Sequence, residues 1–231
     1  MSGFRLTIFA ALAIPAALLV PLAPARAELV LSQLIVELSP PDHARADVEA
    51  WNNGPDRIFV AVDPREIVAA GTSAQSSRTD PDPDKLGLLV SPARIVLEPG
   101  QRKLIRIGSL SPSDRERVYR VTVKPVVGQL SSEQSGLKLL VGYDLLVLVR
   151  PAEPRPHLTG SRSDGQLTIH NDGNVSVELV DGRQCDAAMK ICEKLPDARL
   201  YAGAARTVKL APGNRAEYRM RVGSNVTPVV F

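Results

Sequence analysis

Cys185 and Cys192 are the residues of this chain whose type and spacing most directly suggest a covalent bond. Six residues lie between them, so the pair can close a small loop, which favours a structural disulfide in an oxidising compartment. A redox pair usually has C-x-x-C spacing, and the acidic neighbours Asp186 and Glu193 disfavour a thiolate. A metal site is weaker still, because the nearest histidine, His170, has no second cysteine pair beside it.

The other residue types that often carry catalysis are scattered along the chain. His43, His157 and His170 lie in separate segments without metal-ligand spacing, and no nucleophile elbow, zinc-protease or phosphate-loop motif occurs. The alternating aspartates of residues 80–84 lack the glycine and the glutamate that an EF-hand calcium loop requires. We therefore expect no catalytic residue, no metal, no cofactor and no small-molecule substrate.

The charge and the N-terminus indicate where the protein works. Its 28 basic and 25 acidic residues are interspersed over 231 positions, which argues against nucleic acid as a partner. Residues 1–27 have the parts of a Sec signal peptide: a basic start, an apolar run over 6–22 and an A-x-A site at 25–27. A membrane anchor is the alternative, but two prolines interrupt the apolar run. We expect a cleaved signal peptide and a mature protein that is soluble and lies outside the cytoplasm.

The elements that must position any site are strands. After residue 27 the chain shows short apolar or alternating segments separated by Gly and Pro turns, and no amphipathic helix of convincing length. This pattern predicts an all-β protein built from β-sandwiches. The expected strands are Leu29–Leu38, Ala46–Trp51, Arg57–Val62, Leu86–Val90, Arg94–Leu97, Lys103–Ile107, Val118–Val123, Leu137–Val149, Gln166–His170, Val175–Leu179, Arg199–Ala202, Thr207–Leu210 and Glu217–Val222.

A proline-rich linker divides the chain. Residues 151–156 contain three prolines, which cannot sit in a central strand and stiffen a connection. We expect an immunoglobulin-like domain over 28–150 and a small β-sandwich over 157–231, whose modest core would gain from a disulfide. Residues 69–85 are polar and predict a mobile surface loop, and residues 128–136 predict a flexible connector.

A family resemblance emerges from the order of several motifs. Ser91-Pro92 leads through an apolar strand to Glu98-Pro99-Gly100 and an arginine-bearing strand, then Glu116 precedes an aromatic strand, and a long apolar strand ends at Arg150-Pro151. This order resembles the PapD-like periplasmic pilus-assembly chaperones of the chaperone–usher pathway. It covers most of residues 29–151, whereas the second domain matches only in size, position and β character. The resemblance implies two immunoglobulin-like β-sandwich domains in an L-shaped arrangement.

The resemblance also implies a mechanism. A pilus subunit is an incomplete sandwich, and the chaperone lends it a strand by donor-strand complementation before an outer-membrane usher receives the subunit. The donor residues would be Leu137, Leu139 and Val141, with Tyr143 continuing the row. The alternative is that Leu137–Val149 is only the last core strand of the first domain, which its doubly apolar second half favours.

Of the charged residues in the family's pattern, the chain has one group and lacks the other. Glu116 and Arg150 match its interdomain ion pair, and the third, acidic partner has no clear counterpart, residues 171–174 being a weak candidate. Most members of the family hold the subunit's C-terminal carboxylate with an arginine in the first strand and a lysine in the last. At the corresponding positions this chain has apolar Ile35 and Leu146. The chain therefore either grips its client by hydrophobic contacts alone or uses another cation, for which Lys124 and Lys138 are candidates.

The expected partners are an outer-membrane usher and a pilus or fimbrial subunit. Self-association of the free protein is plausible, because an exposed apolar edge is an aggregation hazard. A structural or adhesive exported protein without chaperone activity is the alternative function, and a general periplasmic holdase is a third.

Overall fold

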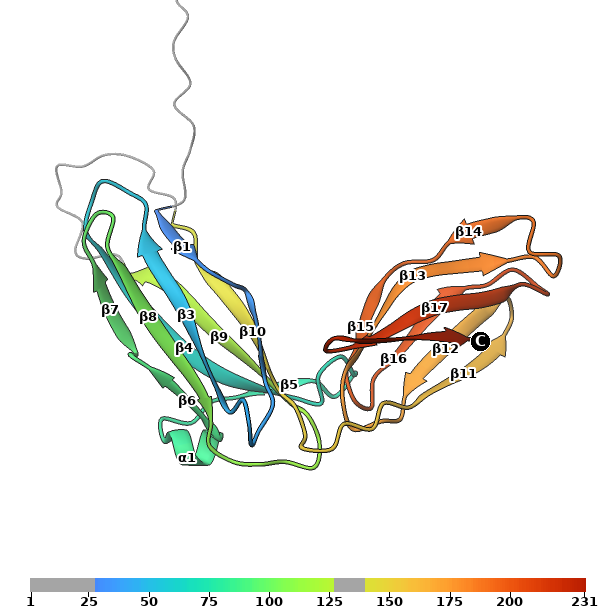
Figure 1. Ribbon diagram of the computed structural model, residues 1–231, viewed down its shortest axis with the longest axis horizontal. Coiled ribbons are helices and arrows are strands. Elements are labelled where there is room, and N and C mark those ends of the chain that lie inside the picture. Colours follow the sequence, from blue (N-terminus) through green and yellow to red (C-terminus); the bar gives the residue numbers. More distant parts are fainter. Residues whose placement is uncertain (1–27, 127–139) are drawn as a thin grey trace, which may run out of the picture.

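The computed structural model describes residues 28–126 and 140–231 and shows two β-rich arms that meet at an angle (Figure 1). Each arm consists of two sheets, and one short helix interrupts the strands. The predicted all-β class with two immunoglobulin-like sandwiches in an L-shape is confirmed. In the described ranges, no helix has the length and apolar character needed to cross a membrane.

The first arm packs a four-stranded sheet of order β1-β3-β8-β6 against a six-stranded sheet of order β2-β10-β9-β4-β5, in which β7 also pairs with β4. Their bounds are β1 Leu29–Leu31, β2 Ile35–Leu38, β3 Arg45–Asn52, β4 Ile58–Val68, β5 Ser76–Arg78, β6 Leu88–Ser91, β7 Arg94–Leu97, β8 Arg102–Ser109, β9 Arg117–Val126 and β10 Tyr143–Val149. The short helix α1 spans Pro83–Leu86.

Alternation along the strands builds the core of this arm. Residues of one parity point inward, so Val48 and Ala50 of β3 meet Val121 and Val123 of β9 in one buried cluster. Tyr119 is the largest fully buried side chain there, and its hydroxyl donates a hydrogen bond to the Leu86 carbonyl at 3.1 Å. A buried tyrosine needs such a partner because an unpaired hydroxyl would destabilise the core.

The first predicted strand, Leu29–Leu38, is wrong as a single element. The structure divides it into β1, which pairs with β3 in one sheet, and β2, which pairs parallel with β10 in the other. Ser32 marks the point of crossing, where its amide still bonds to the Glu49 carbonyl at 2.9 Å. Because the residues on both sides of the crossing are mainly apolar, the sequence pattern did not indicate this change of sheet.

The polar segment 69–85 is also more ordered than predicted. It contains β5 and leads into α1, where Asp82 caps the helix by accepting a bond from the Asp84 amide at 3.0 Å. Burial alone would raise the pKa of Glu66, but hydrogen bonds from Arg117 and Arg78 outweigh it and lower that pKa. The Arg78–Glu66 pair thus fastens β5 of this segment to β4, and Arg117 of β9 pairs with the same carboxylate.

The second arm packs a sheet of order β11-β12-β16 against a sheet of order β14-β13-β17-β18, with β15 also on β13. Their bounds are β11 Leu158–Ser163, β12 Gln166–Asn171, β13 Val177–Cys185, β14 Cys192–Lys194, β15 Ala198–Leu200, β16 Ala205–Lys209, β17 Arg215–Val222 and β18 Asn225–Val230. Its core cluster is smaller than that of the first arm.

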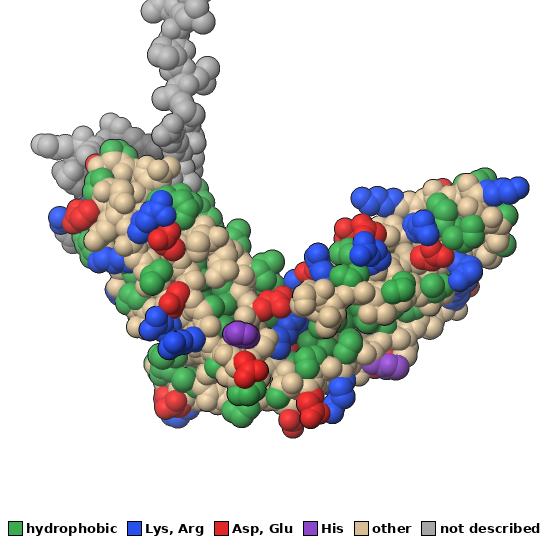
Figure 2. Space-filling view, in the orientation of Figure 1, with side chains coloured by type: hydrophobic (Ala, Val, Ile, Leu, Met, Phe, Trp, Pro, Cys, Tyr) green, Lys and Arg blue, Asp and Glu red, His purple; other side chains and the backbone are tan. Residues whose placement is uncertain are grey.

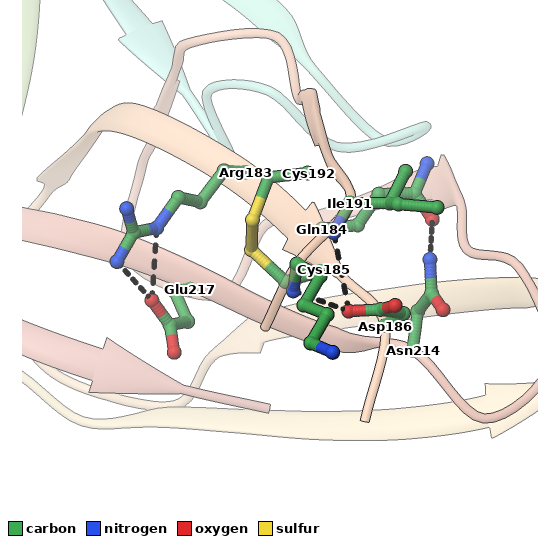
Figure 3. Close-up of a disulfide and its surroundings, with 9 residues drawn as sticks. Arg183, Gln184, Cys185, Asp186, Ile191, Cys192, Asn214 and Glu217 are labelled. Atoms are coloured by element: carbon green, nitrogen blue, oxygen red, sulfur yellow. Dashed lines mark hydrogen bonds and ion pairs between the residues drawn. A yellow bond between two sulfur atoms is a disulfide. The ribbon is translucent and has the colours of Figure 1, made fainter. Parts of the chain in front are cut away.

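The predicted disulfide between Cys185 and Cys192 is present and joins β13 to β14 across a register pair (Figure 3). Asp186 stabilises the loop between them, because its side chain accepts a bond from the Lys190 amide at 2.8 Å. The disulfide thus closes a hairpin at the tip of the second arm, where Ile191 is largely exposed.

Candidate functional site

The strand β10 lies between two neighbours that cover unequal lengths of it. On one side β9 pairs with all of β10, from Tyr143 opposite Val123 to Val149 opposite Arg117. On the other side β2 pairs only from Leu146 onward, with Leu146 opposite Ile35. Tyr143–Leu145 therefore has one free edge among the strands that the structure describes.

The backbone groups at this free edge can be assigned from the hydrogen bonds of the paired half. The Leu146 amide donates to the Leu34 carbonyl at 2.9 Å, and the Arg150 amide donates to the Leu38 carbonyl at 2.7 Å. Even-numbered residues of β10 thus turn their backbone toward β2, and by alternation Asp144 turns its backbone toward the free edge. The Asp144 carbonyl accepts a bond from the Arg120 guanidinium at 3.2 Å, but no other strand of the described chain pairs there.

The predicted donor residues fall into three groups. Leu137 and Leu139 lie outside the described residues. Val141 precedes β10 in irregular backbone and is 53% exposed, so the strand predicted from Leu137 begins, within the described residues, only at Tyr143. Tyr143 is half-buried against the core, and its hydroxyl donates to the Leu29 carbonyl at 2.9 Å. Val141 is thus an exposed apolar side chain beside the free edge, whereas Tyr143 contacts the core of its own arm.

The second half of β10 is buried on both faces. Leu145, Val147 and Val149 belong to the main core, while Leu146 and Leu148 pack in a separate cluster on the other face. This arrangement matches the doubly apolar pattern of Leu145–Val149. The two apolar positions where the family's pattern would place cations, Ile35 and Leu146, are register partners, and Ile35 is 50% exposed.

Arg150 connects the two arms. Its guanidinium forms a buried ion pair with Glu116 and also donates to the Ser176 hydroxyl at 3.0 Å. Glu37 of β2 accepts a further ion-pair contact from Arg150 at 3.0 Å. Buried charges need such pairing, because an isolated buried charge is strongly destabilising. The sequence pattern brought Glu116 and Arg150 together, but it missed Ser176 and Glu37, which no motif marked.

Other contacts support the same junction. The Glu116 amide donates to the Asn174 carbonyl at 2.8 Å, and the Asn174 side chain donates to the carbonyls of Asp114 and Glu153. Asn174 therefore contributes through its amide and not as the acidic partner sought in residues 171–174. Tyr201 of the second arm also packs on the first arm, against the cluster that contains Leu148.

A cleft lies where the arms meet. A groove of about 740 Å³ is lined by residues of the β2–β3 loop, the linker and the β17–β18 turn. A smaller cavity of about 250 Å³ continues it, and Figure 2 shows acidic and basic side chains together in this angle. The described residues contain no cluster of three or more metal-ligating side chains.

Comparison with known proteins identifies the architecture. The family model for the pili and flagellar-assembly chaperone, PapD N-terminal domain, matches residues 30–155, which is more than half of the chain. The chain belongs to this family. The resemblance inferred from the motif order is thereby confirmed.

Two curated relatives of this chaperone-family protein come from Escherichia coli. It is 25% identical to the B subunit of CS1 fimbriae over 146 residues, and 26% identical to the A subunit of CFA/I fimbriae over 149 residues. The matches cover 60% and 61% of this chain and 61% and 62% of those proteins, so the chain spans about six tenths of the relatives that it matches.

Solved structures share the fold over nearly the whole chain. The class 5 fimbriae chaperone CfaA superposes with a TM-score of 0.70 at 20% identity, covering 88% of this chain and 97% of CfaA. A chain from the Salmonella enterica SafA pilin–SafB chaperone complex superposes with a TM-score of 0.59 at 17% identity, covering 90% of this chain and 98% of that one. At such identities these structures establish the two-sandwich fold.

Proposed function

We propose that this protein is a periplasmic chaperone for a fimbrial subunit, which it holds by pairing along the free edge of β10 and by lending apolar side chains. The single observation that carries the proposal is the uncovered edge at Tyr143–Leu145, next to exposed Val141. Membership of the chaperone family and the CfaA-like fold support it.

The free edge of β10 is suited to pairing with a strand of the client. An open edge presents unpaired backbone N–H and C=O groups, which bind another strand with good geometry. Side chains alternate along the added strand, so every second residue can enter an apolar groove of the client. Burying each Leu or Val side chain contributes roughly 1.5–3 kcal/mol. Leu137, Leu139 and Val141 are the residues that we propose to enter the client's groove.

The proposal has two further parts. The signal peptide over residues 1–27 would direct the chain to the periplasm, and an outer-membrane usher would then receive the subunit. The domain limits proposed from the sequence, 28–150 and 157–231 around the linker 151–156, separate the arm that pairs with the client from the arm that frames the cleft. The disulfide suits an oxidising compartment.

Co-expression with a fimbrial subunit encoded next to this gene tests the proposal. We expect a one-to-one complex with the unaltered chain, and loss of the subunit with Val141→Asp, because a charge would be buried in the client's groove. Leu104→Asp is the matched control, since Leu104 is 54% exposed on the opposite sheet and should leave the complex intact. Failure of the unaltered chain to capture any subunit, or equal loss with both variants, would contradict strand lending.

A further inference from the structure

The last strand, β18, forms an open edge of the second arm. It is the end strand in the order β14-β13-β17-β18 and leads to the C-terminus marked in Figure 1. Among the described strands, only β17 pairs with it. Val226, Pro228 and Val230 are exposed along it, so no segment of the described chain covers this edge. An open edge of this kind can pair with a strand of another molecule.

The hydrogen bonds at the end of β18 show which of its residues turn their backbone toward the open edge. The Phe231 amide donates to the Ala216 carbonyl at 2.9 Å, and the Ala216 amide donates to the Phe231 carbonyl at 3.2 Å. Odd-numbered residues of β18 therefore turn their backbone toward β17. By alternation, Val226, Pro228 and Val230 turn theirs toward the open edge. The proline thus occupies the middle of the positions to which a further strand would bond.

Proline is the one common protection against strand pairing that this edge has. Edges are also protected by shortness, by charged side chains or by a bulge. The strand β18 is 6 residues long, its sequence Asn-Val-Thr-Pro-Val-Val has no charge, and its register with β17 is not shifted. At the opposite edge of the same sheet, β14 has only 3 residues and contains a glutamate and a lysine. Pro228 is therefore the residue that decides whether β18 can accept a strand.

Pro228 opposes an incoming strand through its backbone nitrogen. Because the nitrogen carries no hydrogen, a carbonyl of the incoming strand would be buried there without a partner. A ring carbon also stands where the amide hydrogen would point, so the incoming carbonyl cannot approach closely. Two copies of the chain paired antiparallel along β18 could place Pro228 opposite Pro228 and Val226 opposite Val230. Such a pair would lack both central hydrogen bonds.

We propose that Pro228 prevents the chain from pairing with a second copy of itself along β18, and so confines strand pairing between the arms to the free edge of β10. The beginning of β18, residues 225–227, lines the groove where the arms meet, as does Glu37 of β2. A client on β10 would therefore meet β18 in the same angle. The confinement of the client rests on the proposed function, whereas the block on self-pairing does not.

Analytical ultracentrifugation of the free protein over a range of concentrations tests this role. Pro228→Val restores the missing amide donor on the open edge. We expect its self-association constant to exceed that of the unaltered chain by about tenfold or more, the usual scale of a hydrogen bond left unmade by a buried group. Pro212→Val is the matched control, because Pro212 is also exposed but lies in the turn before β17 and on no strand. It should associate no more than the unaltered chain.

A second substitution and the client distinguish this edge from that of β10. Adding Val230→Lys to Pro228→Val should return self-association to that of the unaltered chain, because a lysine on an edge opposes pairing. The one-to-one complex with the fimbrial subunit should dimerise when it carries Pro228→Val, since the client occupies β10 and leaves β18 open.

Two results would overturn the role of Pro228. One is unchanged self-association of Pro228→Val, and the other is association that Val230→Lys does not reverse, which would place the new contact away from β18. Failure of the unaltered chain to capture a subunit would instead contradict the proposed function, and the self-association of the free variants would still decide whether Pro228 blocks β18.

Discussion

The two halves of β10 differ in what covers their edges. Leu146–Val149 lies between β9 and β2 and is buried on both faces, whereas Tyr143–Leu145 has β9 on one side and a free edge on the other. The halves also differ in composition, because Leu146–Val149 is wholly apolar and Tyr143–Leu145 contains Asp144. The difference in edge coverage comes from β2: the chain changes sheets between β1 and β2, and β2 reaches β10 only at Leu146. One strand can thus anchor its own domain and still offer an edge to another chain.

The largest expected effect is in the covered half. Val147→Asp places a carboxylate in the fully buried core between the sheets, where no cation is available among its cluster neighbours. We expect a loss of about 4 kcal/mol or more in the free energy of unfolding, enough to prevent folding of the first arm. Circular dichroism and thermal melting of the purified variant measure this loss. A cooperative transition at an unchanged midpoint would contradict the assignment of this half to the core.

The next effect lies at the end of the same half, where the strand meets the second arm. Arg150→Met leaves Glu116 buried without its cation, and breaking a buried pair costs about 3–5 kcal/mol. We expect a lower melting temperature and a wider distribution of angles between the arms in small-angle X-ray scattering. Arg155→Met is the control, because the Arg155–Glu153 pair is exposed and contributes about 0–1 kcal/mol. Equal effects of the two variants would show that Arg150 does not hold the junction.

Sequence patterns predicted the covered half better than the free half. The covered half Leu146–Val149, with Leu145 before it, is apolar at every position, which predicts burial on both faces, and the structure buries all five residues. The predicted start at Leu137 lies outside the described residues, and within them the strand begins only at Tyr143, although apolar Leu140 and Val141 stand before Gly142. The free edge itself could not be predicted. It depends on where β2 joins the sheet, and that crossing lies more than 100 residues earlier in the chain.

The contacts at the junction between the arms were also predicted only in part from the sequence. Glu116 and Arg150 stood at positions marked by a family pattern, but Ser176 and Asn174 acquire their contacts with the first arm only because the two arms meet at this angle. Periodicity predicts which residues are buried within one sandwich, but it does not report on contacts between two.

A smaller effect tests where Tyr143 belongs. Its hydroxyl bonds to the Leu29 carbonyl, so Tyr143→Phe should lower the free energy of unfolding by about 1 kcal/mol, the usual contribution of one such bond. The ring would remain against the core, and we expect subunit capture to stay unchanged. Denaturant unfolding and co-purification check the two parts separately. Loss of the subunit with unchanged stability would instead place Tyr143 among the residues that enter the client's groove.

The smallest effect on stability is expected in front of the free half. Val141→Asp changes the same residue type as Val147→Asp, six positions earlier, but Val141 is 53% exposed and contributes little to the core. Its free energy of unfolding should change by no more than about 0.5 kcal/mol, as for most surface substitutions. Denaturant melts of the two variants side by side measure the contrast. If Val141→Asp also unfolded the protein, the apolar segment before Tyr143 would be part of this domain's own core, and its side chains would not be available to a client.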